Sequence, residues 1–511
     1  MKICILGGGT SGWLAALWIS KTQPGRHKIT IVDSSKIGII GTGEGTTGLF
    51  QGLLNGQLFG SSINQAEFFR ETKATQKLGV HFVNWRSTPG SFYAPIDNTA
   101  TFREEWDVAL MYHINKYGLK DAHLSTICGN WLENNLCGYD KDQHYSYNHG
   151  AFHFDGHMVG KYFKKLAGKD CTVIDSEYAA CKKDENGNIK SIKLVNGQEI
   201  YADYFIDATG FARVLNKEVE AGWHSYNKYL TLDSAIPFQF QHEPGKDIRP
   251  ITTATALNAG WMWQIPTQER MGCGYVYDST CITYDEALRE LEIKFGKTIE
   301  PIKTIKFEAG RIEKPFCKNV MSIGLSCAFH EPLQATNIHS QIAMLQYFTA
   351  CILRPNTIPE GEYQNKMVNT EYNKTLDQFT DLIQIHHKSG RQDTAYWKKT
   401  QFDTPMTDRV AAVKEFCNRR WPTSIDFFSG YGGAGYGVFI YPIINYEWIN
   451  WKAIGVPDIY KTYGDWMRST KNLSSRVMTH QQLLDGIQSG KITKIGLASQ
   501  AILQKVNDFS F

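Results

Sequence analysis

Three glycines near the start of the chain have the spacing of a dinucleotide-binding loop. The stretch GGGTSG at residues 7–12 contains the G-x-G-x-x-G pattern, and Asp33 follows the next apolar run. In such a loop the first glycine permits a tight turn, the second lets a pyrophosphate approach the backbone, and the third allows a helix to pack closely on a strand. A helix N-terminus adds free N–H groups and a partial positive charge, and the acidic residue holds the ribose hydroxyls. The combination predicts a dinucleotide site rather than a glycine-rich turn without a ligand.

The segment YFIDATG at residues 204–210 indicates which dinucleotide binds. It resembles the strand-ending A-T-G element of two-dinucleotide-type flavoproteins, which contacts FAD. We therefore favour FAD over NAD. Taken alone, the same segment would fit a strand followed by an ordinary turn.

Local patterns predict the elements that hold these loops. Apolar runs at residues 3–6 and 29–32 flank a helical stretch at 13–19, which is the pattern of a Rossmann βαβ unit. A third apolar run at 320–325, followed by a helical stretch at 338–353, predicts another parallel strand that leads into a helix.

Alternating residues between 172 and 206 predict an antiparallel meander. Asn-Gly pairs at 186–187 and 196–197 supply its hairpin turns. The expected strands are 178–179, 189–194 and 200–206. We expect the three blocks to share one sheet system.

The predicted fold class is α/β. An FAD-binding module of the two-dinucleotide (GR2-like) type, with the βαβ unit and the meander, would occupy residues 1–350 discontinuously. Substrate-side insertions are expected around 90–150 and 215–300. Residues 351–511 carry many Trp and Tyr residues and amphipathic helical segments, which predict a mostly helical C-terminal substrate module.

The composition is typical of a folded, cytoplasmic protein with a small-molecule partner. Its 511 residues are 42% hydrophobic and 21% charged, which excludes disorder of the whole chain. The 54 Lys and Arg and 51 Asp and Glu leave a charge of +3, too small to predict nucleic-acid or membrane binding. The 11 cysteines contain no C-x-x-C pair, which favours a reduced compartment. No apolar stretch approaches the roughly 20 residues of a membrane helix.

Several motifs within residues 1–350 form one recognisable set. The most specific is W-x-W-x-I-P, formed by Trp261, Trp263, Ile265 and Pro266. The others are GGGTSGW at 7–13, GTGEGT at 41–46, Lys77 followed by FVNWR at 82–86, FHFDGHMV at 152–159, FIDATGF at 205–211, GCGYVY at 272–277 and GLSCAFHEPLQATNIH at 324–339. Together they resemble the flavin-dependent halogenases of the tryptophan-halogenase type, with weaker similarity beyond residue 350.

The resemblance implies an oxidoreductase that halogenates an electron-rich aromatic compound of the indole or phenol type. It would use FADH2, O2 and a halide ion, with FADH2 supplied by a separate flavin reductase. A flavin hydroperoxide would oxidise the halide, and hypohalous acid would travel inside the protein to a lysine beside the substrate. The substrate's identity and any homo-oligomeric assembly stay open.

The resemblance also assigns site residues. Lys77 takes the place of the catalytic lysine, since a desolvated amine can hydrogen-bond hypohalous acid or form a haloamine. Backbone N–H groups of Thr336 and Asn337 would bind the halide. The expected wall between flavin and substrate is Trp261, Trp263, Ile265 and Pro266. The expected cofactor-binding residues are Gly7, Gly9, Thr10, Ser11, Gly12, Asp33, Gly43, Glu44, Asp207, Gly210 and Gly324.

Gln334 departs from the family pattern. The sequence Glu331-Pro332-Leu333 is followed by Gln334, where the family has a second active-site glutamate. A carboxylate there can accept the proton of an arenium ion, whereas an amide can only position groups by hydrogen bonding. We keep Gln334 as a catalytic candidate and hypothesise a broader substrate range with bromide or iodide preferred.

Two alternative functions stay open. A flavin aromatic monooxygenase usually has a G-D dipeptide near the third block, but Gly324 is followed by Leu325 here. A catalytically inactive flavin-binding protein is the other alternative, because of Gln334.

Two groups of histidines receive no catalytic role from the sequence. His149, His153 and His157 are spaced by four, but Asp155 is predicted as a helix N-cap, so they would not share one helix face and no metal site is predicted. His386 and His387 are assigned to surface or core packing.

Overall fold

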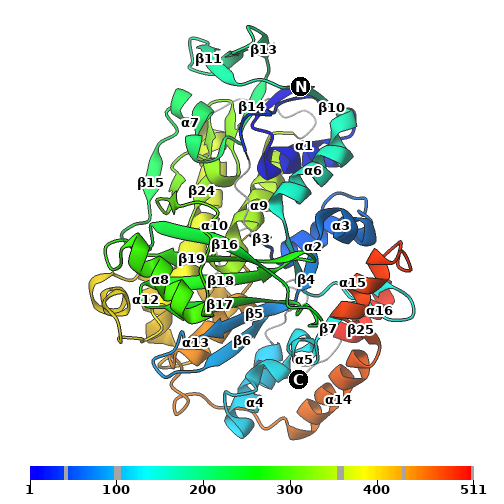
Figure 1. The fold of residues 1–511 in the computed structure, drawn as a ribbon, viewed down its shortest axis with the longest axis vertical. Helices are drawn as coiled ribbons and strands as arrows, with labels where there is room; N and C mark the ends of the chain where they lie inside the picture. Colours follow the sequence, from blue (N-terminus) through cyan, green and yellow to red (C-terminus); the bar gives the residue numbers. More distant parts are fainter. Residues whose placement is uncertain (39–43, 97–104, 354–361, 428–432, 508–511) are drawn as a thin grey trace.

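The computed structural model describes residues 1–38, 44–96, 105–353, 362–427 and 433–507. In Figure 1 the N-terminal strands lie in the upper part, a second, larger sheet crosses the middle, and the last helices of the chain (orange and red) lie below it and to its right.

A six-stranded sheet forms the upper part. In spatial order its strands are β10 (Cys171–Ile174), β2 (Lys28–Val32), β1 (Lys2–Leu6), β14 (Tyr204–Asp207), β23 (Val320–Ser322) and β22 (Phe316–Cys317). β1 pairs in parallel with both β2 and β14, and α1 (Thr10–Thr22) connects β1 to β2. This confirms the βαβ unit. β23 pairs in parallel with β14, so the third apolar run joins the same sheet, as predicted.

The antiparallel meander forms a separate sheet, so the expectation that all three blocks share one sheet system was wrong for the meander. Its strands are β11 (Tyr178–Lys183), β12 (Ile189–Leu194) and β13 (Glu199–Tyr201). Gly187 and Gly197 have the positive φ that the two predicted turns need. The prediction of one strand over 200–206 was wrong, because the chain leaves the meander after Tyr201. Residues 204–207 join the parallel sheet instead, and all four are buried, as a strand covered on both faces requires.

A seven-stranded sheet crosses the middle of the molecule. In spatial order its strands are β20 (Ile305–Lys306), β16 (Ser234–Gln241), β19 (Arg270–Tyr277), β18 (Gly260–Pro266), β17 (Ile251–Leu257), β5 (Gly79–Val83) and β6 (Ser91–Pro95). The whole W-x-W-x-I-P motif lies on β18. Because β18 pairs with β17 and β19, the motif lies in the interior of this sheet.

Shorter strands form three smaller sheets among the described residues, besides the meander. β3 (Glu44–Gly45), β9 (Ala151–Phe154) and β4 (Thr75–Lys77) form one small sheet with β9 in the centre. Asp155 follows β9 and caps α6 (Gly156–Ala167), accepting the N–H groups of His157 and Met158, which confirms the predicted N-cap. The other short strands are β15 (Trp223–Ser225), β21 (Gly310–Ile312), β24 (Ala328–Phe329), β25 (Val477–Thr479), β7 (Leu136–Asp140), β8 (Tyr145–Ser146) and β26 (Gly496–Leu497).

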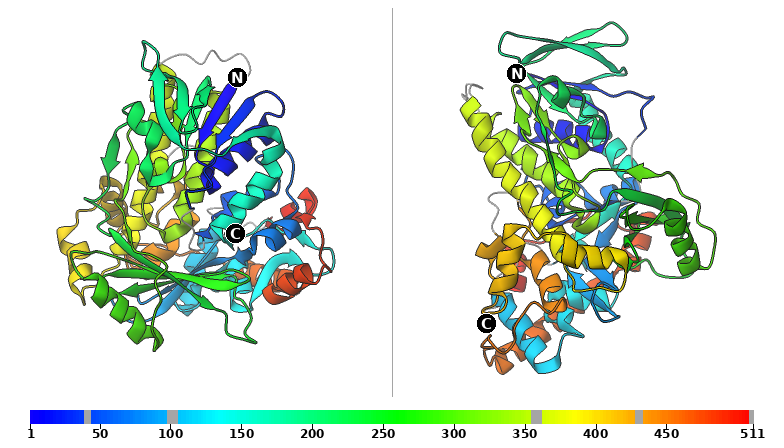
Figure 2. Two further views of the ribbon diagram at one scale, coloured as in Figure 1. Left: turned by 45° about the horizontal axis from the view of Figure 1, so that its top comes forward. Right: turned by 90° about the vertical axis from the view of Figure 1, so that its left-hand side faces the viewer.

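Residues 362–507 are mostly helical, as predicted. Their helices are α10 (Glu362–His387), α11 (Ala395–Lys398), α12 (Asp408–Phe416), α13 (Gly437–Asn445), α14 (Tyr460–Ser474), α15 (His480–Gln488) and α16 (Gln500–Asn507). α10 packs against α9 (Thr336–Cys351), α12 and α13. In the right-hand view of Figure 2, α10 (yellow) runs diagonally from the upper part of the molecule to the lower helices. The same stretch shares its apolar cores with earlier segments, since Trp397 and Phe439 pack in one cluster with Trp261.

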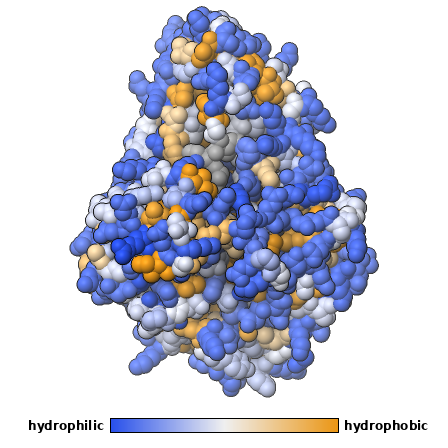
Figure 3. Space-filling view, viewed as in Figure 1, coloured by the Kyte–Doolittle hydropathy of each residue, from blue (hydrophilic) through white to orange (hydrophobic). Residues whose placement is uncertain are grey.

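The remaining helices lie in the first 300 residues. They are α2 (Gly48–Leu54), α3 (Gln65–Thr72), α4 (Glu105–Tyr117), α5 (Ile127–Glu133), α7 (Val214–Glu218) and α8 (Tyr284–Phe295). No helix in the described part of the chain is both long and apolar enough to cross a membrane. On the face shown in Figure 3, hydrophilic residues cover most of the surface and hydrophobic residues lie in small groups.

Candidate functional site

The glycine loop after β1 has the shape that a phosphate group needs. Gly7 has a φ of +111°, and a Cβ there would lie 2.4 Å from the carbonyl oxygen of Ala208. A Cβ at Gly12 would lie 1.9 Å from the carbonyl oxygen of Gly7, so neither position accepts a side chain. At Gly9, by contrast, a Cβ would meet no atom within 4 Å. Gly9 is the N-cap of α1 and makes no side-chain cap, which leaves the first N–H groups of the helix available to a pyrophosphate.

Asp33 follows β2 at the same edge of the sheet. A Cβ at Gly8 would lie 1.9 Å from Asp33 Oδ1, so the carboxylate lies directly against the glycine loop. Asp33 also forms an ion pair of 2.9 Å with Lys164, and its side chain keeps 21% exposure. An accessible carboxylate beside the loop fits the ribose of a dinucleotide.

The other predicted cofactor loops lie near α1. Gly210 has a φ of +63°, and a Cβ there would meet no atom within 4 Å. A Cβ at Gly324, whose φ is +65°, would lie 2.2 Å from Ser11 Oγ, so the third block packs on the start of α1. Thr10 Oγ1 donates to the carbonyl oxygen of Gly156 at 2.8 Å. The Gly324 and Gly156 segments therefore both contact the first residues of α1.

The carboxylate of Asp207 accepts hydrogen bonds from neighbouring residues of the protein. Asp207 is fully buried, and its Oδ1 accepts the N–H of Thr209 at 3.0 Å and the Thr209 hydroxyl at 2.6 Å. Its Oδ2 accepts the N–H of Asn216 at 2.9 Å. The Asp207 side chain therefore supports the turn that leads to Gly210, and its predicted place in the cofactor site stays a prediction.

Glu44 lies close to the start of α6, and its predicted neighbour Gly43 lies outside the described residues. A Cβ at Gly156 would lie 2.2 Å from Glu44 Oε1. Burial raises the pKa of Glu44 to about 7, and the nearby charge of Asp155 adds to this rise. Asp155 is itself paired with Arg270. A carboxyl group that is partly protonated at neutral pH can donate a hydrogen bond.

Lys77 ends β4 with its side chain buried. It is 2% exposed, and its Nζ donates to the carbonyl oxygen of Thr46 at 3.1 Å. Burial lowers the pKa of Lys77 to about 7, so a large share of the molecules carries a neutral amine near neutral pH. A Cβ at Gly45 would lie 3.1 Å from Lys77 Nζ and 3.6 Å from the Cβ of Ala335. Lys77 and the segment around Ala335 therefore both lie close to Gly45.

The segment before α9 has an unusual backbone. Gln334 and Ala335 have φ values of 64° and 57°, so two successive residues with side chains adopt the left-handed conformation. Such residues cost conformational energy and cluster at functional sites. Helix α9 begins at Thr336 and has no side-chain cap. The N–H groups of Thr336 and Asn337 therefore lie in the first turn of a helix, where they have no intrahelical acceptor and the helix dipole favours an anion.

The two tryptophans of β18 are buried next to each other. Trp261 and Trp263 are 1% and 4% exposed, with ring centroids 6.2 Å apart. Trp261 Nε1 donates to Glu331 Oε1 at 3.1 Å, which connects β18 to the segment that carries Gln334. The remaining predicted wall residues, Ile265 and Pro266, are buried further along the same strand.

The sequence interpretation missed part of the role of His386 and His387. Both are buried, as packing residues are, but each also forms a hydrogen bond to the Glu331–Gln334 segment. Their position in the long helical stretch before Arg391 contains no signal for these partners, because the partners lie more than 50 residues earlier in the chain.

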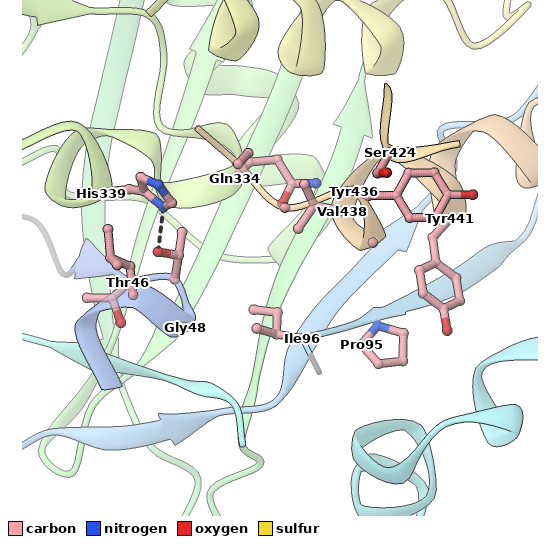
Figure 4. A pocket seen from close by; sticks show the side chains of 15 residues that line it. Thr46, Gly48, Pro95, Ile96, Gln334, His339, Ser424, Tyr436, Val438 and Tyr441 are labelled. Carbon is pink, nitrogen blue, oxygen red and sulfur yellow. Dashed lines mark hydrogen bonds between the residues drawn. The ribbon is translucent and has the colours of Figure 1, made fainter. Parts of the chain in front are cut away.

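A cavity of about 490 Å³ opens beside these groups. Figure 4 shows the Gln334 side chain between His339 on one side and Tyr436 on the other, with the Thr47–His339 hydrogen bond drawn as a dashed line. The described residues that line the cavity include Thr46, Thr47, Gly48, Leu49, Pro95, Ile96, Gln334, His339, Ser424, Ala434, Tyr436, Val438 and Tyr441. Thr46 also accepts the hydrogen bond of Lys77, so the cavity begins near the buried amine.

Comparison with known sequences gives a consistent result. The profile of the family described as tryptophan halogenase matches residues 2–437. Tryptophan 7-halogenase RebH of Lentzea aerocolonigenes is 31% identical over 431 residues, which are 78% of each chain. The 7-chloro-L-tryptophan 6-halogenase KtzR of a Kutzneria species is 28% identical over 464 residues, 84% of this chain and 87% of that one.

Solved structures share the fold. A flavin-dependent halogenase from Xanthomonas campestris has a TM-score of 0.84 at 22% identity, covering 98% of this chain and 99% of that one. A tryptophan C-6 flavin-dependent halogenase from taromycin biosynthesis has a TM-score of 0.83 at 25% identity, covering 95% and 99%. The arrangement of the two large sheets and the helices is therefore that of flavin-dependent halogenases.

Proposed function

Because the chain belongs to the tryptophan halogenase family, we propose that it uses FADH2, O2 and a halide ion to halogenate an electron-rich aromatic compound of the indole or phenol type. A separate flavin reductase supplies the FADH2. The observation that carries the proposal is the buried amine of Lys77 beside the cavity wall at Thr46.

The N-terminal part of the chain, around the start of α1, holds the flavin. The open position at Gly9 and the first N–H groups of α1 receive the pyrophosphate, and Asp33 receives the ribose. When bound, the reduced flavin supplies the activation of O2 that converts a halide into hypohalous acid. The halide is held by the N–H groups of Thr336 and Asn337. These groups lie in the first turn of α9, where the helix dipole favours an anion.

Lys77 holds the electrophilic halogen. Its amine is desolvated and keeps two or three hydrogens for donation, of which one is used by Thr46. In its protonated form it donates to the oxygen of hypohalous acid, so the water that leaves takes up a proton as the halogen bonds to the aromatic carbon. The amine that results is a base that can take up the proton that the arenium ion must lose.

Trp261 and Trp263 separate the flavin site from the aromatic substrate. Two buried indoles on one strand face form a rigid wall, and Glu331 fixes the orientation of the first. A wall of this kind prevents direct hydroxylation of the substrate.

Gln334 removes a carboxylate from the active site. An amide cannot accept the arenium proton, so positional control by a second carboxylate is lost. We propose a broad substrate range and a preference for bromide or iodide, since softer halides are more readily oxidised.

The test is a halogenation assay with purified protein, a flavin reductase, and panels of indoles and phenols in chloride, bromide or iodide. We expect Lys77→Met to lower the halogenated product at least ~100-fold while FADH2 oxidation continues. Lys161→Met, a change at an exposed lysine on α6, is the matched control. Retention of halogenation by Lys77→Met, or hydroxylated product from the unaltered protein, would contradict the proposal, and higher rates with chloride would contradict its halide part.

A further inference from the structure

The two adjacent histidines at the end of α10 hold opposite ends of one active-site segment. His386 contacts Gln334 and His387 contacts Glu331. Both imidazoles are buried, at 0% and 4% exposure. The segment between their partners leads into the strained backbone of Gln334 and Ala335, so its position depends on these two anchors.

The contacts of His386 determine where its proton lies. Its Nε2 is 2.8 Å from Gln334 Nε2, and its Nδ1 is 3.2 Å from the hydroxyl of Tyr446. An amide nitrogen can only donate, so His386 Nε2 must be unprotonated and its hydrogen must be on Nδ1, facing Tyr446. The ring stacks on Phe82 at 4.7 Å and lies against Trp85, and this burial lowers the pKa of His386 well below its usual value. The imidazole is therefore neutral.

His387 donates through Nε2, the nitrogen at which His386 accepts. The hydroxyl of Tyr396 is 2.8 Å from Nδ1, and Nε2 is 2.9 Å from Glu331 Oε1. A carboxylate can only accept, so Nε2 carries a hydrogen and donates it to Glu331. Trp261 donates to the same carboxylate oxygen. His387 thus binds an acceptor and His386 binds a donor, and the two neighbours are not interchangeable.

We propose that His386 is a positioning residue for Gln334: by accepting the Gln334 amide N–H at its Nε2, it turns the Gln334 carbonyl oxygen toward the cavity as a hydrogen-bond acceptor. The proposal rests on the proposed function for its chemical meaning. Gln334 lines the cavity, so the free end of its amide faces the reaction space. A carbonyl oxygen there accepts the O–H of hypohalous acid or the N–H or O–H of an indole or phenol. A rotated amide would present N–H donors to the same groups.

A double-mutant cycle tests whether His386 acts through Gln334. His386→Phe keeps an aromatic ring against Phe82 but removes the acceptor. We expect it to lower the halogenated product per FADH2 oxidised about 10-fold, the usual effect of one net hydrogen bond, and less than about 2-fold in a Gln334→Ala background. Equal losses in both backgrounds would overturn the proposal, because His386 would then act independently of residue 334.

The proton position is tested without turnover. In protein labelled with ¹⁵N-histidine, the His386 signals are identified by their absence in His386→Phe, and we expect the hydrogen on Nδ1. If that variant does not fold, Tyr446→Phe identifies the signals by shifting them. A hydrogen on Nε2 would overturn the proposal. This measurement decides the question even if the protein halogenates no compound in the panel, in which case the proposed function fails and the positioning role is judged separately.

Discussion

The burial of Lys77 leads to a quantitative prediction about stability. The pKa of Lys77 falls from its ordinary 10.5 to about 7 in the folded protein. Between these values the unfolded chain binds the proton and the folded chain does not, so the free energy of unfolding rises with pH across this range. The stability gained when Lys77 is deprotonated is present in full above a pH of about 10.5 and is lost as the pH falls to about 7. Summed from pH 6 to pH 9, the difference in protons bound by the unfolded and folded chains is equivalent to a shift of about two pKa units. This raises the free energy of unfolding by about 3 kcal/mol.

Lys77→Met removes this dependence because methionine fills the same space without a titrating group. We expect the unaltered protein to gain about 3 kcal/mol relative to Lys77→Met between pH 6 and pH 9. Denaturant unfolding of both proteins at pH 6, 7.5 and 9 measures the difference, with Lys161→Met as the exposed control whose difference stays constant. Parallel curves for Lys77→Met and the unaltered protein, within about 1 kcal/mol, would refute the reasoning, because an amine without a shifted pKa must reach water or an anionic partner.

Three further predictions concern the loops and the wall. In thermal melts, Gly12→Ala should unfold the loop, because its Cβ would lie 1.9 Å from a carbonyl oxygen, whereas Gly9→Ala should melt like the unaltered protein. In a fluorescence titration, Gly9→Ala should weaken FAD binding about 10-fold. Normal FAD affinity in Gly9→Ala would argue against pyrophosphate binding at this position. Trp261→Phe should cost ~1–3 kcal/mol in denaturant unfolding, since Glu331 loses a buried hydrogen bond, and an unchanged midpoint would contradict that role. Gln334→Glu should raise the rate with chloride relative to bromide in steady-state assays, and an unchanged ratio would show that residue 334 does not control halide preference.

Local features of the fold could be predicted from the sequence. The βαβ unit within residues 2–32 was predictable because its helix and strands have distinct hydrophobic periods and its glycine loop is constrained by backbone sterics. The Asp155 N-cap was predictable for the same reason, since the cap satisfies N–H groups only two and three residues away. The third strand of the meander was predicted too long because alternation cannot show where a chain moves from one sheet to another.

The sequence by itself determined the types of residue at the site: the glycines, Lys77, the tryptophans of β18 and the glutamine at 334. Only the tertiary structure decided their states. Lys77 is a surface-type residue until the segments around Gly45 and Ala335 pack near its amine, and the different hydrogen-bonding roles of His386 and His387 depend on partners more than 50 residues away. The physical reason is that desolvation and hydrogen bonding depend on which distant segments pack around a group, whereas spacing along the chain records only its immediate neighbours.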